Sequence, residues 1–325
     1  MAANDTARAL WYPAPGRVEL REEAVPPVGA GDVRVVALHG ALSRGTEALI
    51  FAARVPPSEY QRMRAPFMGG NFPFPVKYGY STVGVIEAGP SALIGRKVFA
   101  LHPHQTRFVI PTDAAVPVPD NVPPARAILA ANMETALNAV WDAAPGPADH
   151  IAVIGAGVVG ALVAWLCRKL PGAQVTLVDV DASRAALAAS LGVGFAAPED
   201  APTNCDLVVQ ASGSGKGLAT ALTLAGDEAT ILDMSWYGAD HVTLPLGGAF
   251  HSRRLKLISS QVGQVAPSHR ARWSHRRRLA AALALLADPV LDGLIAPAVN
   301  FVDLPARLPH ILAPGSGVLC QRIDY

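Results

Sequence analysis

Short apolar runs divide the chain into two regions of different texture. Up to residue 122, clusters of Pro and Gly separate short β-rich runs, among them 33–38, 81–87 and 107–110. This pattern is typical of an antiparallel, barrel-like domain. From residue 123, Ala-rich helical patterns alternate with short apolar strands, which indicates βαβ units around a parallel sheet. The β-rich texture returns near the C-terminus, so we predict one domain from 1–122 with 296–325 and a second from 123–295.

The apolar periodicity of the second domain places its elements in order along the chain. Strands are expected at 150–154, 174–179, 206–210 and 229–233, and helices at 158–169, 182–191 and 216–225. A strand near 255–261 and a helix near 276–286 would complete the sheet. We therefore expect an α/β fold in which a doubly wound parallel sheet of the Rossmann type is joined to a β-rich domain.

The composition indicates a folded protein and narrows its partners. Of 325 residues, 51% are hydrophobic and 16% are charged, which excludes a disordered chain. The formal net charge of +1 lacks the basic excess of nucleic-acid-binding proteins. Three cysteines are too few for a disulfide framework or a closed zinc site, and the N-terminus shows no export signal. We therefore expect a cytoplasmic protein with a small-molecule substrate, which binds neither nucleic acid nor a membrane.

The strongest chemical signal is a glycine-rich turn between a predicted strand and a predicted helix. It reads Gly155-Ala156-Gly157-Val158-Val159-Gly160, and Asp179 follows nineteen residues later at the end of the next predicted strand. Gly155 permits a tight turn, Gly157 lets the backbone approach a pyrophosphate, and Gly160 lets helix and strand pack closely. Free amides at the helix N-terminus attract negative charge. We therefore predict a dinucleotide site, with Val158 and Val159 in the same turn.

Asp179 indicates which dinucleotide binds. A carboxylate at this strand end accepts hydrogen bonds from a free 2′-hydroxyl and repels a 2′-phosphate, so the sequence favours NAD over NADP. Arg184 lies a few residues further on and is a candidate to cover the adenine. An interpretation of Arg184 as a solvated helix residue has equal support.

Four further stretches carry a family resemblance. They are Ser43-Arg-Gly-Thr-Glu47, Gly79-Tyr-Ser-Thr-Val-Gly84, Gly95-Arg-Lys-Val98 and Thr135-Ala-Leu-Asn-Ala139. With the glycine turn, they make the chain resemble the medium-chain dehydrogenase/reductase superfamily over nearly its whole length. The first two are most similar to the bacteriochlorophyllide dehydrogenase-like branch. The resemblance implies a GroES-like catalytic domain, a Rossmann domain and an NAD(P)-dependent oxidoreductase.

The chain departs from the zinc alcohol dehydrogenases of this superfamily at the metal ligands. The three positions that carry catalytic zinc in those enzymes correspond here to Arg44, Tyr80 and Ala131. Alanine offers no ligand, arginine is a fixed cation and tyrosine is a rare zinc ligand. The four-cysteine lobe of the structural zinc is also missing. We therefore expect an enzyme without zinc.

Without zinc, hydride transfer to a carbonyl needs another group that stabilises charge on oxygen. Tyr80 is a candidate proton donor, and Arg44 is a candidate to stabilise an alkoxide or enolate. The alternative is that Tyr80 only packs and that Arg44 pairs with Glu47.

Two further candidates follow from the resemblance. Thr46 falls where the family places a proton-relaying hydroxyl, although it is also suited to cap a short helix. His102 corresponds to a position that lines the substrate pocket, and a histidine there is expected to titrate near neutral pH. His104 is a weaker candidate for the same role.

The resemblance also implies contacts to the cofactor beyond the glycine turn. Thr135 is expected near the nicotinamide, and Ser212, Gly213 and Met234 are expected to border the dinucleotide at two strand ends. Asp233 is unusual at its strand end, where it either bonds to the cofactor or faces solvent.

Residues 251–278 form a local basic run with eight Lys or Arg and no Asp or Glu. The run covers a predicted strand and a helix start instead of one helical face, so we interpret it as solvated surface. The strand at 255–260 within it is expected to pair with its twin in a homodimer, as the resemblance implies.

Three functions remain open at this point. The first is a zinc-independent oxidoreductase that interconverts a secondary alcohol and a ketone with NAD(H). The second is an NAD(P)H-dependent enone or quinone reductase, which needs only an enolate to be stabilised. The third is a dinucleotide-binding sensor without catalytic activity.

Overall fold

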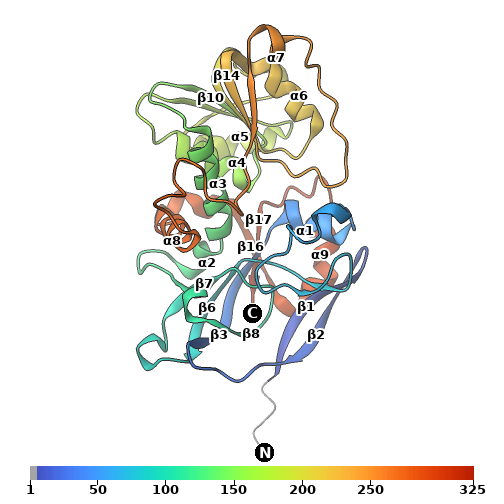
Figure 1. Ribbon diagram of the computed structural model, residues 1–325, viewed down its shortest axis with the longest axis vertical. Coiled ribbons are helices and arrows are strands. Elements are labelled where there is room, and N and C mark those ends of the chain that lie inside the picture. The colour runs from blue at the N-terminus through green and yellow to red at the C-terminus, as the bar shows by residue number, and fades with distance from the viewer. Residues whose placement is uncertain (1–5) are drawn as a thin grey trace, which may run out of the picture. The chain divides into compact units, whose positions relative to one another are not determined.

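The structure, a computed structural model, describes residues 6–325 and divides the chain into two compact units (Figure 1). Unit 1 comprises Met1–Ala131 and Arg276–Tyr325, and unit 2 comprises Asn132–His275. Unit 1 therefore also takes 123–131 and 276–295, which the sequence pattern assigns to the second domain. One physical reason is that Arg126 binds Asp292 through two hydrogen bonds of 2.7 Å, which ties these two added segments together.

Unit 1 contains two sheets, a four-stranded sheet in the order β2-β1-β5-β4 and a seven-stranded sheet in the order β16-β17-β3-β6-β7-β9, with β8 paired to β3. Its strands are β1 (Thr6–Ala14), β2 (Arg17–Ala24), β3 (Asp32–Leu42), β4 (Gly69–Gly70), β5 (Val76–Lys77), β6 (Thr82–Ala88), β7 (Lys97–Ala100), β8 (Arg107–Pro111), β9 (Val116–Pro117), β16 (Ile295–Asn300) and β17 (Cys320–Asp324). Its helices are α1 (Arg44–Phe51), α2 (Pro124–Ala127), α8 (His275–Leu285) and α9 (Leu304–Leu312). This β-rich unit confirms the predicted texture.

The core of unit 1 follows the period-two pattern of its strands. Val33 and Val35 on β3 are fully buried, and they pack with Ile86 on β6 and with Phe108 and Ile110 on β8. Both neighbouring strands run antiparallel to β3. Successive strand residues point to opposite faces of a sheet, so alternate apolar positions meet on one side.

Unit 2 is a six-stranded parallel sheet in the order β12-β11-β10-β13-β14-β15. Its strands are β10 (His150–Ile154), β11 (Gln174–Val178), β12 (Gly194–Ala196), β13 (Cys205–Gln210), β14 (Ala225–Asp233) and β15 (Lys256–Ser259). Its helices are α3 (Ala130–Ala143), α4 (Val158–Cys167), α5 (Ala185–Leu191), α6 (Gly215–Leu224) and α7 (Ala249–Ser252). The strand order confirms the predicted doubly wound fold.

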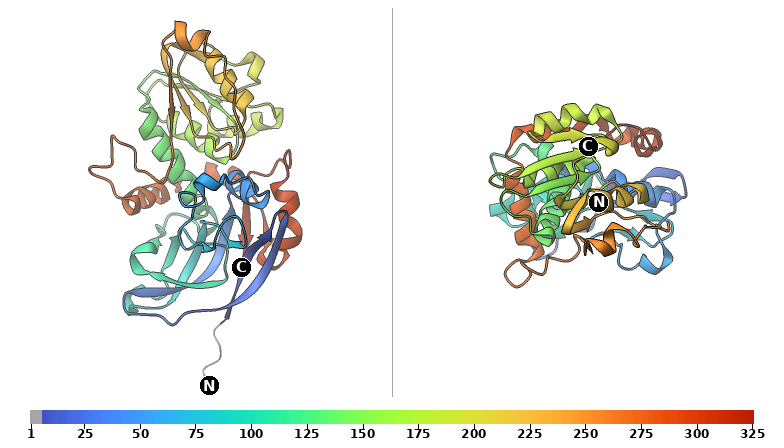
Figure 2. Two further views of the ribbon diagram at one scale, coloured as in Figure 1. Left: turned by 45° about the vertical axis from the view of Figure 1, so that its right-hand side comes forward. Right: turned by 90° about the horizontal axis from the view of Figure 1, so that it is seen from above.

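The direction of winding reverses between β10 and β13. From β10 the chain proceeds through α4 and α5 toward β12, and from β13 it proceeds through α6 toward β15. Right-handed crossovers in opposite directions place their helices on opposite faces of the sheet, and Figure 2 shows α4 and α5 on one face with α6 on the other. The carboxyl ends of β10 and β13 therefore form the point where ligands bind in open α/β sheets.

The predicted elements of unit 2 occur, with differences at their ends. The strand at 150–154 is matched by β10, whereas the helix expected at 182–191 begins as a 3₁₀ turn, Ala182–Arg184, before α5. The Asp181 carboxylate caps this turn by accepting from the Ser183 N–H at 3.0 Å. In unit 1, the hydrophobic pattern of the sequence gives no clear signal for the hairpin of β1 and β2 or for the helix α9.

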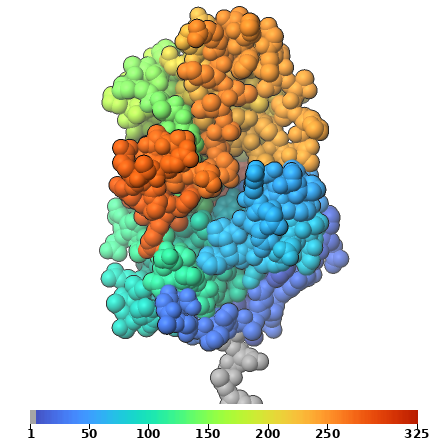
Figure 3. Space-filling view, in the orientation of Figure 1, coloured from blue at the N-terminus to red at the C-terminus, as the bar shows by residue number. Residues whose placement is uncertain are grey.

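Most of the basic run lies at the surface, as expected, but its last residue, Arg278, is buried with 1% of its surface exposed. Arg254, Lys256, Arg270 and Arg272 are exposed, and the segment that follows β15 forms part of the surface in Figure 3. All four residues of β15 are exposed, at the edge of the sheet. Pairing of this strand with a second copy stays a prediction. Within residues 6–325, no helix has both the length and the apolar character needed to cross a membrane.

Gly84 marks a close approach between β6 and β3. A Cβ atom at Gly84 would lie 2.4 Å from the Val36 carbonyl oxygen and 2.5 Å from Val35 Cγ1. We predict that Gly84→Ala lowers the free energy of unfolding by about 1–3 kcal/mol, because a backbone atom cannot give way as a flexible side chain does. Urea unfolding monitored by circular dichroism measures the change.

Gly45 is the matched control in the same unit. It is exposed, lies in α1 and has open space where a Cβ would stand, with no atom within 4 Å. Gly45→Ala should therefore stabilise the helix by about 0.5–1 kcal/mol. Equal effects of the two substitutions would contradict the assignment of Gly84 as a packing glycine.

Candidate functional site

The glycine-rich turn joins β10 to α4 at the carboxyl end of the sheet. Gly155 has φ of +100°, and a Cβ there would lie 2.7 Å from the backbone of Ser212. A Cβ at Gly160 would lie 1.9 Å from the carbonyl oxygen of Gly155. The tight turn and the close packing predicted for these two glycines are therefore both present, and neither position accepts a side chain.

Gly157 differs from its two neighbours in the motif. It is exposed, its φ of −74° suits any residue, and nothing lies within 4 Å of a Cβ built on it. It is also the N-cap of α4 and supplies no side chain to the free amides of the first turn. The turn thus leaves open space beside N–H groups that have no partner within the helix and beside the positive end of the helix dipole, which fits an anionic pyrophosphate.

Asp179 follows β11 and supports the same turn. Its Oδ2 accepts from the Ala156 N–H at 2.6 Å, and its Oδ1 accepts from the Asp181 N–H at 2.9 Å. A carboxylate has about four acceptor positions, so capacity for ribose hydroxyls remains. Arg184 forms an ion pair with Asp181, with Nε and Oδ2 3.3 Å apart.

The ends of β13 and β14 bring a second set of predicted cofactor residues together. Gly213 donates its N–H to the Ser235 hydroxyl at 3.0 Å, and Ser212 Oγ accepts from Gln210 Nε2 at 3.0 Å. Met234 donates its N–H to the Gln210 carbonyl at 2.9 Å. Ser212 and Gly213 are exposed at this edge of unit 2.

Asp233 is neither free in solvent nor isolated. Its carboxylate accepts from the Ser235 N–H at 2.9 Å and from the Tyr237 hydroxyl at 3.0 Å. Burial raises the pKa of Asp233 above its usual value, although these hydrogen bonds oppose the shift. Burial likewise raises the pKa of Tyr237 to about 12, so its phenol stays protonated at neutral pH.

Thr135, which is expected near the nicotinamide, lies in α3 and is half-buried.

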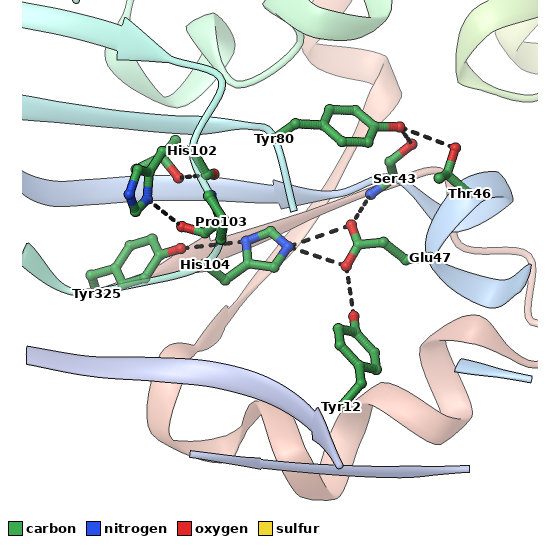
Figure 4. A network of polar contacts seen from close by, with 10 residues as sticks. Tyr12, Ser43, Thr46, Glu47, Tyr80, His102, Pro103, His104 and Tyr325 are labelled. Atoms are coloured by element: carbon green, nitrogen blue, oxygen red, sulfur yellow. Dashed lines mark hydrogen bonds and ion pairs between the residues drawn. The ribbon is translucent and has the colours of Figure 1, made fainter. Parts of the chain in front are cut away.

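Unit 1 gathers three hydroxyl groups at the start of α1 (Figure 4). The Tyr80 hydroxyl donates to Ser43 Oγ and lies 3.2 Å from Thr46 Oγ1. Ser43 is the N-cap residue of α1, and Thr46 lies in its first turn. Burial raises the pKa of Tyr80 above the usual tyrosine value, and the bonds to Ser43 and Thr46 partly offset the shift. The cluster is therefore a set of protonated hydroxyls at neutral pH.

Glu47 lies behind this hydroxyl cluster and is completely buried. Its Oε1 accepts from the Ser43 N–H at 2.7 Å, and its Oε2 accepts from the Tyr12 hydroxyl at 2.7 Å. His104 Nε2 lies 3.2 Å from Oε2, which makes an ion pair when the imidazole is protonated (Figure 4). His104 is thus an ionisable partner of Glu47 in this structure.

Arg44 is turned toward the C-terminal end of α9. Its guanidinium donates to the carbonyl oxygens of Ile311 at 3.0 Å and Ala313 at 3.2 Å, and also to that of Val318. Carbonyls at a helix C-terminus have no partners within the helix, so a guanidinium with several donors satisfies them well. In this structure Arg44 ties the segment after α9 to α1, and its role beside a substrate oxygen stays a prediction.

His102 has an environment different from the expected one. Its ring stacks on Phe108 with centroids 3.7 Å apart and faces Phe67 at 5.6 Å, and its Nδ1 lies 2.9 Å from the Pro103 carbonyl. Burial lowers its pKa to about 3. The prediction that His102 titrates near neutral pH is therefore wrong, because a buried imidazole without an acidic partner stays neutral.

The three positions that align with zinc ligands hold no ligand set. Arg44 and Tyr80 are engaged as described, and Ala131 in α3 offers only a methyl group. Among residues 6–325, His, Cys, Asp and Glu side chains form no group of three or more that is arranged to hold a metal ion.

Sequence reasoning missed several members of the buried network. From the sequence alone, His104 is a weaker candidate than His102. Nothing in the sequence links Tyr12 or Tyr325 to Glu47, because both are far from it along the chain. Ser43 has a local signal, since Ser is a favoured N-cap residue before a short helix. Its contact with Tyr80, 37 residues away, could only be found in three dimensions.

A β-rich unit interrupted by a doubly wound α/β unit, with a glycine turn at the switch point, is also the fold of several solved dehydrogenase structures. No protein-family model matches the chain. L-idonate 5-dehydrogenase from Escherichia coli has a similar structure, with a TM-score of 0.81 and 14% identity over 98% of both chains. A short chain alcohol dehydrogenase from Escherichia coli CFT073, complexed with NADH, has a TM-score of 0.79 and 16% identity over 99% of this chain and 100% of that one.

A curated relative matches a part of the sequence. L-threonine 3-dehydrogenase from Edwardsiella ictaluri (strain 93-146) is 34% identical over 124 residues, which are 37% of this chain. The match spans about a third of that protein, 34% of its length. The comparisons thus define the fold, and activity is inferred from the site.

The burial of His102 gives a pH dependence of stability. Its pKa is about 3 in the folded state and about 6.5 when unfolded, so the unfolded state binds more protons between these values. Stability is therefore retained above pH 6.5 and is lost as the pH falls toward 3. We predict that acidification from pH 7 to pH 5 lowers the free energy of unfolding of the protein by about 2 kcal/mol through protonation of His102 in the unfolded state.

The measurement is urea unfolding at both pH values for the native chain and for His102→Phe. Phenylalanine keeps a planar ring on Phe108 but cannot take up a proton. The free energy of unfolding of the native chain should therefore fall by about 2 kcal/mol more than that of His102→Phe between pH 7 and pH 5. Other titrating groups affect both proteins equally, so their effects cancel in this comparison. The same pH dependence in both proteins would show that His102 is accessible to protons.

Proposed function

We propose that the chain is a zinc-independent oxidoreductase that transfers hydride between NAD(H) and a secondary alcohol or ketone. The observation that carries this proposal is the turn at Gly157, where open space adjoins the N-terminus of α4 at the switch point of the sheet. Structural relatives named as dehydrogenases, one of them complexed with NADH, support the same assignment.

The residues of unit 2 favour NAD. Asp179 is already anchored on the turn by the Ala156 N–H, which directs its carboxylate to the strand end where the adenosine ribose of a dinucleotide lies. Because a carboxylate repels a 2′-phosphate, NADP is expected to bind less tightly. Arg184 is engaged with Asp181, so adenine recognition by Arg184 requires that ion pair to open or turn.

The hydroxyl cluster of unit 1 supplies the proton chemistry in this proposal. Bound NADH supplies a hydride to the carbonyl carbon of the ketone. As the C=O π bond breaks, Tyr80 gives its phenolic proton to the oxygen, which yields the alcohol. Ser43 and Thr46 stabilise the phenolate through their hydroxyl groups, and solvent returns the proton. The reverse sequence oxidises the alcohol, with Tyr80 as the base.

Zinc independence follows from the residues at the aligned ligand positions. Arg44, Tyr80 and Ala131 include a cation and a methyl group, and the Tyr80 phenol has a raised pKa, which disfavours the phenolate that a metal would bind. The donor set does not fit zinc, so the polarising role falls to Tyr80.

The deciding experiment is NADH oxidation by chelator-treated protein with simple ketones, quinones and enones. Ketone turnover that is unaffected by chelation supports the proposal. Turnover of conjugated substrates alone would indicate an enone or quinone reductase, in which hydride goes to a β-carbon. Tight NADH binding without any turnover would indicate a dinucleotide sensor.

Tyr80→Phe tests the proton donor. We predict a fall in kcat of about 10²–10⁴-fold, because the ring is kept and only the acidic hydroxyl is lost. Affinity for NADH, measured by fluorescence titration, should stay within a factor of two, since the cofactor is bound by unit 2. A variant that keeps full activity would remove Tyr80 from the chemistry.

Gly157→Val tests the cofactor cradle. The backbone at Gly157 accepts any residue and no protein atom opposes the new side chain, so the variant should fold normally. We predict at least a tenfold loss in NADH affinity, about 1.4 kcal/mol, because valine fills the space needed by the pyrophosphate. The melting temperature should fall slightly at most, because valine is a poorer N-cap residue than glycine. Undiminished NADH affinity would place the cofactor elsewhere.

A further inference from the structure

Glu47 and His104 form a pair of ionisable side chains with no exposed surface at all. A buried charge is costly to remove from water, and a buried ion pair usually contributes little or nothing to stability relative to apolar residues. Packing alone therefore does not account for this pair. The groups that are hydrogen-bonded to this pair indicate its function.

Each polar atom of the pair has a defined neighbour. The two oxygens of Glu47 accept from the Ser43 N–H and from the Tyr12 hydroxyl, both at 2.7 Å. An ionised carboxylate offers only acceptors, so Nε2 of His104 donates toward it at 3.2 Å. On the other side of the ring, Nδ1 lies 3.5 Å from the Tyr325 hydroxyl. The imidazole is thus held in one orientation (Figure 4).

The backbone is shaped to admit the His104 ring. Gly79, directly before Tyr80, has φ of +123°, and a Cβ there would lie 2.8 Å from Cδ2 and Nε2 of His104. A Cβ at Gly40 would lie 2.9 Å from the Tyr325 hydroxyl. Two glycines therefore make room for the network, and one of them is covalently joined to the candidate proton donor.

We propose that Glu47 and His104 are a buried positioning dyad for the Ser43–Thr46–Tyr80 cluster. Glu47 fixes Ser43 through its backbone amide, so that the Ser43 hydroxyl is in place to accept from Tyr80. The Nε2–H of His104 donates toward the carboxylate and stabilises its charge, which would otherwise oppose the negative charge that develops on the Tyr80 oxygen when it gives up its proton. Neither residue of the dyad touches the substrate, and this inference rests on the proposed function for its kinetic consequence.

The first test compares His104→Gln with His104→Leu in the full chain. The Gln amide nitrogen can still donate to Glu47, whereas Leu leaves the carboxylate without this donor. We expect His104→Leu to lower kcat about 10–100-fold with KM within a factor of three, and His104→Gln to recover most of the loss. If His104 had a purely structural role, the substitutions would change the melting temperature but would not lower kcat at a nearly constant KM.

His39 offers a matched control. It forms a similar pair with Asp324, with Nδ1 and Oδ1 2.8 Å apart, but both side chains are about a quarter to a third exposed, at 25% and 34%. His39→Leu should leave kcat unchanged. Equal losses in the His39 and His104 variants would overturn the proposal, because they would reflect general destabilisation of unit 1.

A second measurement does not depend on turnover or on the folding of His104→Leu. In Glu47→Gln one carboxylate oxygen becomes an amide that cannot accept, so the Ser43 N–H and the Tyr12 hydroxyl compete for one acceptor. We expect the Ser43 amide proton resonance to move upfield and its hydrogen exchange to accelerate. An unchanged Ser43 amide would refute the positioning link.

The two measurements separate the two proposals. If the native chain turns over no substrate, the proposed function fails, while the Ser43 amide still reports whether Glu47 holds it. If the native chain is active and His104→Leu retains full kcat, the dyad is refuted and the proposed function stands.

Discussion

The buried Glu47 carboxylate is the interaction on which the polar part of unit 1 depends. Four separate segments converge on it: β1 through Tyr12, the start of α1 through Ser43, the loop that carries His104 and, through His104, the C-terminal Tyr325. A buried carboxylate has to be satisfied by donors or it destabilises the fold. This requirement sets where each segment passes, and the Ser43–Tyr80 contact lies directly beside it.

Unit 2 depends on a different constraint, the absence of side chains at one turn. Gly155 and Gly160 are required by backbone contacts, whereas Gly157 leaves space that no protein atom fills. The glycine turn therefore combines two needs, close packing of α4 on β10 and access for a ligand to the helix N-terminus. Asp179 reinforces both, because it accepts from the turn and stands at the adjoining strand end.

The residues at the zinc-aligned positions make contacts of their own in this structure. Arg44 is used to satisfy carbonyls at the end of α9, and Tyr80 enters a hydroxyl cluster with Ser43 and Thr46. A phenol with a raised pKa is a proton donor at neutral pH, a role that complements hydride transfer. In the function proposed above, Glu47 and His104 position that donor.

The sequence by itself determined the fold class, the parallel sheet of unit 2 and the glycine turn. Strands buried in a parallel sheet read as continuous apolar runs, and the turn is specified by local backbone needs, so β10 and Gly155–Gly160 were predicted in place. Only the tertiary structure decided that Glu47 meets His104, that Arg44 turns to α9 and that His102 is neutral within an aromatic stack. These contacts join residues far apart in the chain. Their partners, their burial and hence their pKa values depend on strand register and topology, which local propensity does not encode.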